Sequence, residues 1–247
     1  MKKLKITLVL MIAIVLMPFN TNAQEQTESK ILSISEITVK EGHNKQFLEG
    51  VKQWKECYLE NKGTDSWNLW KQFQGSGHVY VMTGVNKNFA ELDMDDAASK
   101  SCRDIVKDFI MPHVESVDYN IASTMPDVSR DFMQGTKVIW VNFYRVKNAV
   151  IFTDLIKERV SIIKEVEGSP RSFWYSYMGG GPNAPHFFVS TPFKSFADMD
   201  VKRDNVWKLI EKAKGKKKAD QIRDAGRAVI ENSWSYIYEL NEELSKQ

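Results

Sequence analysis

Residues 138–146 read VIWVNFYRV, and this stretch decides the fold. Its β-branched and aromatic residues are those favoured in strands, so it predicts a β-strand. Because successive strand residues point to opposite faces of a sheet, Trp140 and Tyr144 would lie on one face. Val141 and Phe143 would lie on the other. Both faces are therefore apolar, which predicts a sheet that is covered on both sides.

The same pattern occurs a second time, 107 residues earlier in the chain. Residues 31–39, ILSISEITV, again predict a strand rich in Ile and Val. Identical residues recur at this shift: Val39, Lys40, Leu48, Trp67, Lys87, Phe89, Ala90 and Asp93 match Val146, Lys147, Leu155, Trp174, Lys194, Phe196, Ala197 and Asp200. An ordered series of this kind indicates an internal repeat.

Each copy continues with the same series of predicted elements. An amphipathic helix follows the first strand, with apolar stripes formed by Phe47, Val51, Trp54 and Tyr58 and by Phe152, Ile156, Val160 and Ile163. Two aromatic-rich strands flank a glycine-containing turn, at residues 66–83 and 172–190. A β-rich run follows these glycines where a phosphate-binding loop would need a helix, so phosphate binding is not expected.

A second helix and a last strand complete each copy. We expect a helix at 96–111 before a strand near 117–123, and a helix starting near 204 before a strand near 233–239. The second copy is nine residues longer there, which places an insertion at the lysine-rich stretch 212–218, interpreted as a solvated helix extension that breaks at Gly215.

The predicted order is thus β-α-β-β-α-β in both copies, the ferredoxin-like motif. The first repeat covers residues 24–130, the second covers 137–247, and residues 126–136 contain the linker. This motif places both helices on one face of the sheet, so its other face needs cover. We therefore expect an α+β fold in which the two repeats pack sheet to sheet as a pseudo-dimeric α/β barrel.

Residues 1–23 resemble a secretory signal peptide. A basic start is followed by an apolar run of 14 residues from Ile6 to Phe19, and Ala23 ends a short stretch of small and polar residues. At about 1.5 Å per residue the run is too short to span a bilayer, so we expect cleavage after Ala23 and a periplasmic or secreted protein. The mature chain would carry 31 basic and 32 acidic residues, which favours neither nucleic acid nor a membrane as partner.

The chain has two cysteines, Cys57 and Cys102. In a ferredoxin-like motif the end of the first helix lies beside the start of the second, and the two cysteines fall at these positions. An exported protein could join them in a disulfide. Two buried free thiols are the alternative.

With this element order, and with pieces such as Val39-Lys40-Glu41-Gly42 followed by Phe47-Leu48, the chain resembles the dimeric α/β-barrel superfamily as a tandem fusion of two copies. Its members include antibiotic-biosynthesis-type monooxygenases and NIPSNAP-like proteins. The resemblance implies a barrel, but the superfamily contains cofactor-free oxygenases, haem enzymes and binding proteins, so it does not choose a function.

Aromatic residues are the main candidates for a functional site, since the chain has 7 Trp, 8 Tyr and 13 Phe. An apolar pocket with a few polar groups is the usual form of a small-molecule site. We expect a pocket between sheet and helices with these ligand-binding residues: Trp67, His78, Tyr80, Trp140, Trp174, Tyr177 and His186. The alternative for each aromatic residue is ordinary core packing.

No metal site, cofactor or catalytic residue is indicated by the sequence. Its four histidines form no metal-ligand spacing, and Asp93, Asp95 and Asp96 precede a predicted helix, where capping is their expected role. Haem-binding relatives hold an axial histidine in a ferredoxin-like half. The second half offers His186, which falls on a predicted strand and not on a helix.

Two functions are compatible with these features. The first is an exported module that binds a small hydrophobic or aromatic ligand. The alternative is a cofactor-independent, monooxygenase-like enzyme, in which one polar group such as His78 would stabilise a substrate anion. A His, Asp or Glu beside the aromatic residues of the pocket would favour the enzyme. Because the fused halves already pair with each other, we expect a monomer.

Overall fold

The computed structural model describes residues 28–247, so the predicted signal peptide lies outside the described residues. Strand β1 (Ile31–Val39) leads into helix α2 (Asn44–Glu60), and strands β2 (Asn68–Gln72) and β3 (His78–Asn86) follow. Short helical segments then precede strand β4 (Val114–Thr124). They are the 3-10 helix Phe89–Asp93, α3 (Ala97–Ser101), α4 (Arg103–Ile105), the π-helix Val106–Ile110 and the 3-10 helix Met111–His113.

The second half of the chain has a similar order of elements. Strand β5 (Val138–Val146) precedes helix α5 (Ala149–Glu167) and the strands β6 (Phe173–Tyr177) and β7 (Phe187–Phe193). The half ends with α6 (Val206–Lys214), α7 (Lys216–Val229) and β8 (Ile230–Leu240), and 3-10 turns lie at Pro126–Val128 and Phe196–Asp200. In the part of the chain that the structure covers, the helices are too short or too polar to cross a bilayer.

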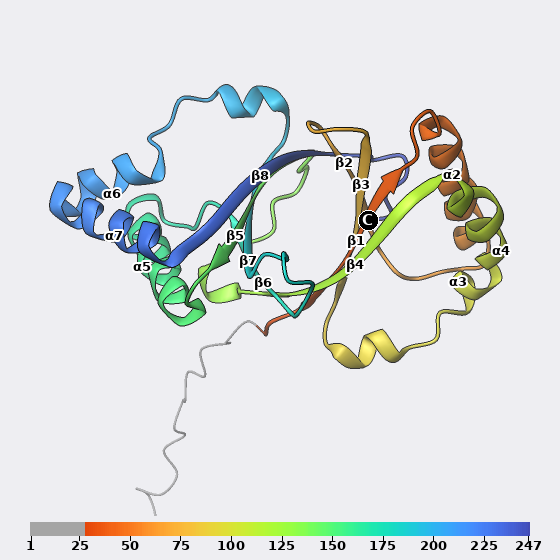
Figure 1. The fold of residues 1–247 in the computed structure, drawn as a ribbon, viewed down its shortest axis with the longest axis horizontal. Coiled ribbons are helices and arrows are strands. Elements are labelled where there is room, and N and C mark those ends of the chain that lie inside the picture. Colours follow the sequence, from red (N-terminus) through yellow and green to blue (C-terminus); the bar gives the residue numbers. More distant parts are fainter. Residues whose placement is uncertain (1–27) are drawn as a thin grey trace, which may run out of the picture.

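The eight strands form one closed barrel in the order β1-β3-β2-β8-β5-β7-β6-β4. Neighbouring strands are antiparallel, and the two halves join at both sheet edges. At one edge Trp70 of β2 pairs with Leu240 of β8, and at the other Ala122 of β4 pairs with Tyr177 of β6. Helices of the first half lie on one side of the barrel and those of the second half on the opposite side (Figure 1). The two sheets therefore face each other and are also hydrogen-bonded edge to edge.

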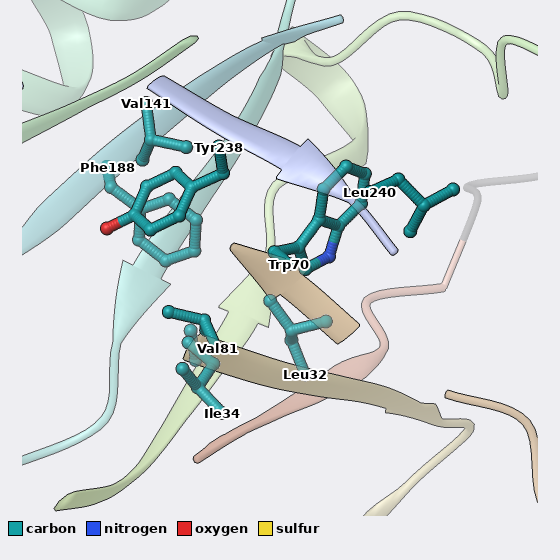
Figure 2. Close-up of a cluster of buried hydrophobic side chains, with 9 residues drawn as sticks. Leu32, Ile34, Trp70, Val81, Val141, Phe188, Tyr238 and Leu240 are labelled. Atoms are coloured by element: carbon teal, nitrogen blue, oxygen red, sulfur yellow. The ribbon is translucent and has the colours of Figure 1, made fainter. Parts of the chain in front are cut away.

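Side chains from both halves fill the inside of the barrel (Figure 2). Leu32, Ile34, Trp70 and Val81 come from the first half and meet Val141, Phe188, Tyr238 and Leu240 from the second. This shared core is the missing cover that the two-sided apolar strands predicted. Burial of so many apolar side chains is the main term that holds the halves together.

The outer face of each sheet carries its own helices. In the second half the predicted stripe of α5 is buried, since Phe152, Ile156, Val160 and Ile163 are each at most 6% exposed. Helix α5 begins after Asn148, whose side chain accepts a hydrogen bond from the Ile151 amide. In the first half Phe47, Val51 and Tyr58 of α2 are buried in the same way.

The second helical region of the first half differs from the continuous helix expected at 96–111. It is divided into α3, α4 and a π-helix. Pro112 lacks an amide hydrogen and stops any α-helix that approaches it. In the second half the break falls at Gly215, whose φ of 81° favours glycine, so α6 and α7 are separate helices, as the lysine-rich insertion predicted.

A disulfide joins Cys57 to Cys102, with 6.0 Å between their Cα atoms. It links the last turn of α2 to the junction between α3 and α4. The tail that follows β8 returns to the first half, where Lys246 bridges to Trp67 and Leu244 joins the core under α2. Figure 1 marks this C-terminus beside β3. The outer layer of the first half is therefore both cross-linked and covered by the tail.

Candidate functional site

A cleft of about 400 Å³ lies between the outer face of the second sheet and α5, and we call it the sheet cleft. Its floor consists of strand residues and its walls of α5 and the loop before α6. The main lining residues are Trp140, Asn142, Tyr144, Trp174, Val189, Thr191, Arg159, Val160, Ile163, Met199, Val201 and Arg203. Its position matches the pocket between sheet and helices that the sequence predicted.

A second cleft of about 630 Å³, the helix cleft, lies among α5, α6 and α7. Trp207, Ile222, Arg223 and Gly226 belong to its lining. Arg159 lines both clefts. This side chain therefore stands at the boundary between them.

The floor of the sheet cleft follows from the alternation of β5. Val141 points into the barrel, so its neighbours on the strand point outward, toward α5. Tyr144 stacks on Trp174 with 5.9 Å between ring centroids and an angle of 22°. Trp140 is 42% exposed, so its ring is accessible from solvent. These rings form a flat apolar wall suited to a planar molecule.

Arg159 stands where the apolar stripe of α5 would place another hydrophobic residue. It follows Phe152 by seven positions and Ile156 by three, so it shares their face. Its guanidinium lies 5.1 Å from the centre of the Trp207 ring, as does that of Arg223. Both are at cation-π distance, so Trp207 holds Arg159 against the wall of the cleft.

The charge on Arg159 has no carboxylate partner among residues 28–247. Its Nε atom is buried and makes no hydrogen bond there. Burial lowers the pKa of the Arg159 guanidinium, and the Tyr144 hydroxyl acts in the opposite direction. Burial likewise raises the pKa of Tyr144, while the charge of Arg159 opposes that rise. An arginine stays protonated at neutral pH, so the cleft holds a buried, unpaired cation.

The neighbouring charges are mostly paired. Arg171 binds Glu167 and donates to the Asp204 carbonyl at 2.9 Å, and its hydrogen bond lowers the pKa of the Glu167 carboxyl. Lys208 and Lys212 both bind Asp204. Arg203 lies over the Phe193 ring at 5.8 Å, and burial together with nearby Arg171 lowers its pKa.

The structure brings two of the predicted site residues, Trp140 and Trp174, into the sheet cleft. Trp67 and Tyr80 lie in the packed layer of the first half. Trp67 donates its indole hydrogen to the Leu244 carbonyl at 2.8 Å, and the Tyr80 hydroxyl donates to Asn44 at 2.8 Å. Both side chains are buried and have their polar atoms satisfied, which is the core-packing alternative.

The other three predicted residues lie elsewhere. Tyr177 packs against the barrel core, where burial and the nearby Glu36 raise its pKa to about 12. His78 begins β3 and pairs with Val39 of β1. His186 precedes β7, and its Nδ1 accepts a hydrogen bond from the Val146 amide at 3.0 Å, which ties the strand to the end of β5.

The first half has no equivalent of Arg159 in its helical stripe. Seven residues after Phe47, the place taken by Arg159 in the second half, stands Trp54. Its ring packs 4.8 Å from Trp67 and 5.6 Å from Tyr58, so three aromatic rings fill the layer. The two halves thus share a plan but differ at one stripe position.

The residues of the clefts do not fit a haem held by histidine. No histidine lines either cleft in the described chain, and His186 uses its Nδ1 to bind Val146. Within residues 28–247 no three His, Cys, Asp or Glu side chains gather as a metal site would require.

No protein-family model matches this chain, and no curated protein matches it either. Solved structures do. A proposed monooxygenase from Fusobacterium nucleatum is similar over 90% of this chain and 95% of its own, with 14% identity and a TM-score of 0.53. A proposed monooxygenase from Lactobacillus acidophilus is similar over 86% and 94%, with 12% identity and a TM-score of 0.53. Chlorite dismutase from Candidatus Nitrospira defluvii is similar over 88% and 93%, with 7% identity and a TM-score of 0.53.

These structural neighbours belong to the ferredoxin-like dimeric α/β-barrel superfamily. The closed eight-strand barrel of this chain has the fold of that superfamily. Identities of 14% and below show the fold alone. The function of this chain has to be argued from its own site.

Proposed function

We propose that this protein binds a small hydrophobic or aromatic molecule in the sheet cleft. The observation that carries this proposal is the wall formed by Trp140, Tyr144 and Trp174 beside the unpaired Arg159. A volume of about 400 Å³ lies within the range of small-molecule sites and would accept a molecule of one to two rings. We further propose that the two similar halves are ferredoxin-like repeats of one ancestral unit, of which the second kept an open cleft.

Filling the sheet cleft should abolish binding. Asn142 lies on its floor between Trp140 and Tyr144, and Asn142→Trp would place an indole where the ligand ring stacks. We expect the affinity for a naphthalene-type probe to fall at least 10-fold in this variant. Quenching of intrinsic tryptophan fluorescence on titration with the probe measures it.

The repeat offers a matched control. Ser35 of β1 occupies the position that Asn142 holds in β5, because the two residues are 107 apart. Ser35→Trp adds the same ring to the outer face of the first sheet and should leave the affinity within about 2-fold. Equal loss in both variants, or none in Asn142→Trp, would contradict the sheet cleft as the binding site.

A cofactor-independent oxygenase of the antibiotic-biosynthesis type is the second candidate. The structural similarity to proposed monooxygenases favours it. Asp198 and Asp204 line the sheet cleft, but Asp204 is bound by lysines and Asp198 accepts from the Lys194 amide. His78 lies outside the cleft, so Arg159 is the polar group left to stabilise a substrate anion. Oxygen uptake with a phenolic substrate, lost in Arg159→Met, would support the enzyme over a binding module.

Export and a monomeric state are also proposed. The Cys57–Cys102 disulfide suits an oxidising compartment, and the closed barrel already pairs the two sheets within one chain. Protein purified from the periplasm should have, in light scattering, the mass of a single chain of 224 residues, which is 247 minus 23. Twice this mass would refute the monomer, and an intact mass that includes residues 1–23 would refute cleavage.

A further inference from the structure

We propose that Arg159 makes the sheet cleft selective for aromatic molecules that carry a carboxylate. This inference rests on the proposed function and names the chemical class of its ligand. Arginine presents a planar fork of N–H donors that matches the two oxygens of a carboxylate. An aromatic acid could stack its ring on the cleft wall and direct its carboxylate to this fork.

The first argument is the unsatisfied state of Arg159. Its Nε is buried without a hydrogen-bond partner in the described chain, although buried polar atoms are nearly always bonded. Tyr144 is the titratable group that acts on it, and a neutral hydroxyl cannot neutralise a guanidinium. A carboxylate from outside would supply both the missing acceptor and the missing charge.

The second argument is that the surroundings cannot supply this anion. Across the sheet cleft, Glu167 is occupied by Arg171, and Asp204 by Lys208 and Lys212. Across the helix cleft, Asp220 is bound to Arg223 and Lys216. Glu211 is the other carboxylate of that lining, on α6. Arg203 adds a further positive charge to the sheet cleft.

The third argument is geometric. Cation-π contact with Trp207 holds the guanidinium from the side of the helix cleft, at 5.1 Å. The ring wall of Tyr144 and Trp174 faces the other cleft that Arg159 lines. The cation is thereby positioned before any ligand arrives, and positioning in advance lowers the entropy cost of binding.

The test compares 2-naphthoate with 2-naphthamide, a neutral molecule of nearly the same shape. We expect wild-type protein to bind naphthoate at least 10-fold more tightly, measured by calorimetry. Arg159→Gln should remove this preference by weakening naphthoate at least 10-fold while changing naphthamide less than 3-fold. Arg103→Gln removes the same charge from an exposed site on α4 and should change neither affinity beyond 2-fold.

Arg159→Met serves as the second variant in case the glutamine variant folds poorly. Methionine fills a similar volume with no buried charge, so its melting temperature should equal or exceed that of wild type. A marked fall in melting temperature would instead indicate a structural role for Arg159 and overturn the inference. Equal binding of both probes by wild type, or a preference that survives in Arg159→Gln, would also overturn it. If wild type binds neither probe, the proposed function itself fails.

Discussion

Removing the Cys57–Cys102 disulfide should lower the free energy of unfolding by about 4 kcal/mol. The bond closes a loop with a sequence separation of 45 residues, and in the chain-entropy model a loop of this length restricts the unfolded chain by that amount. Cys102 is fully buried, so Ala replacements at both positions avoid placing new polar groups in the core. Urea unfolding of the double variant Cys57→Ala with Cys102→Ala measures the loss.

Reduced wild-type protein is the control, because it keeps both sulfur atoms but lacks the bond. It should lose nearly as much stability as the double alanine variant, the difference being the apolar contacts of the two thiols. The prediction is contradicted by two free thiols in unfolded protein isolated without reductant. It is equally contradicted by unfolding midpoints that do not depend on reductant.

Much of the barrel could be predicted from the strands. The alternation of Trp140 and Tyr144 with Val141 and Phe143 is a local property, set by the two-residue period of an extended chain. Since it made both faces apolar, it required a second layer on each side, and the barrel core and α5 are these layers. Patterns that repeat with the geometry of one element can therefore be interpreted without knowing the rest of the fold.

The choice among the aromatic residues could not be made in this way. Trp67 and Trp174 occupy equivalent places in the two halves, and both are buried. Their surroundings differ because Trp54 and the C-terminal tail cover Trp67, whereas Trp174 borders a cleft. What covers a residue from a distant part of the chain has no signal in the residue's own neighbourhood.

Arg159 shows a signal that the sequence did contain. A charged residue seven positions after Phe152 interrupts an apolar stripe, and long charged side chains are rarely buried without a partner. Counting each stripe position separately would have marked it, since Val160 on the adjacent position kept the stripe apparently complete. Which cleft the guanidinium faces could not be predicted, because that depends on α6 and on the position of Trp207.

The helical region before β4 also depended on a distant contact. Gly50 of α2 lies against the π-helix Val106–Ile110, and the two backbones approach so closely that a Cβ at Gly50 would lie 2.3 Å from the Phe109 carbonyl oxygen. The close approach places a limit on residue 50 that its own helix does not impose. Composition alone would suggest that glycine is a defect in this helix, since it lowers helix stability by about 1 kcal/mol relative to alanine.

Gly50→Ala should therefore destabilise the protein by roughly 3 kcal/mol, the upper part of the range for overpacked cores. The added Cβ would meet backbone atoms of Phe109 at 2.3 and 2.8 Å, and backbone cannot rotate away as a flexible side chain can. One of the two helices has to shift, which also disturbs the core around Phe47 and Ile110. The change in free energy of unfolding is measured with urea.

Gly226→Ala in α7 is the matched control, because a Cβ there meets nothing within 4 Å. Both glycines lie inside helices, so both substitutions gain the same helix propensity and differ only in the space available. Gly226→Ala should stabilise the protein by about 0.5 to 1 kcal/mol. Opposite signs for the two variants would show that close packing of α2 on the π-helix determines residue 50. If Gly50→Ala were also stabilising, the two helices would have to be farther apart than the structure places them.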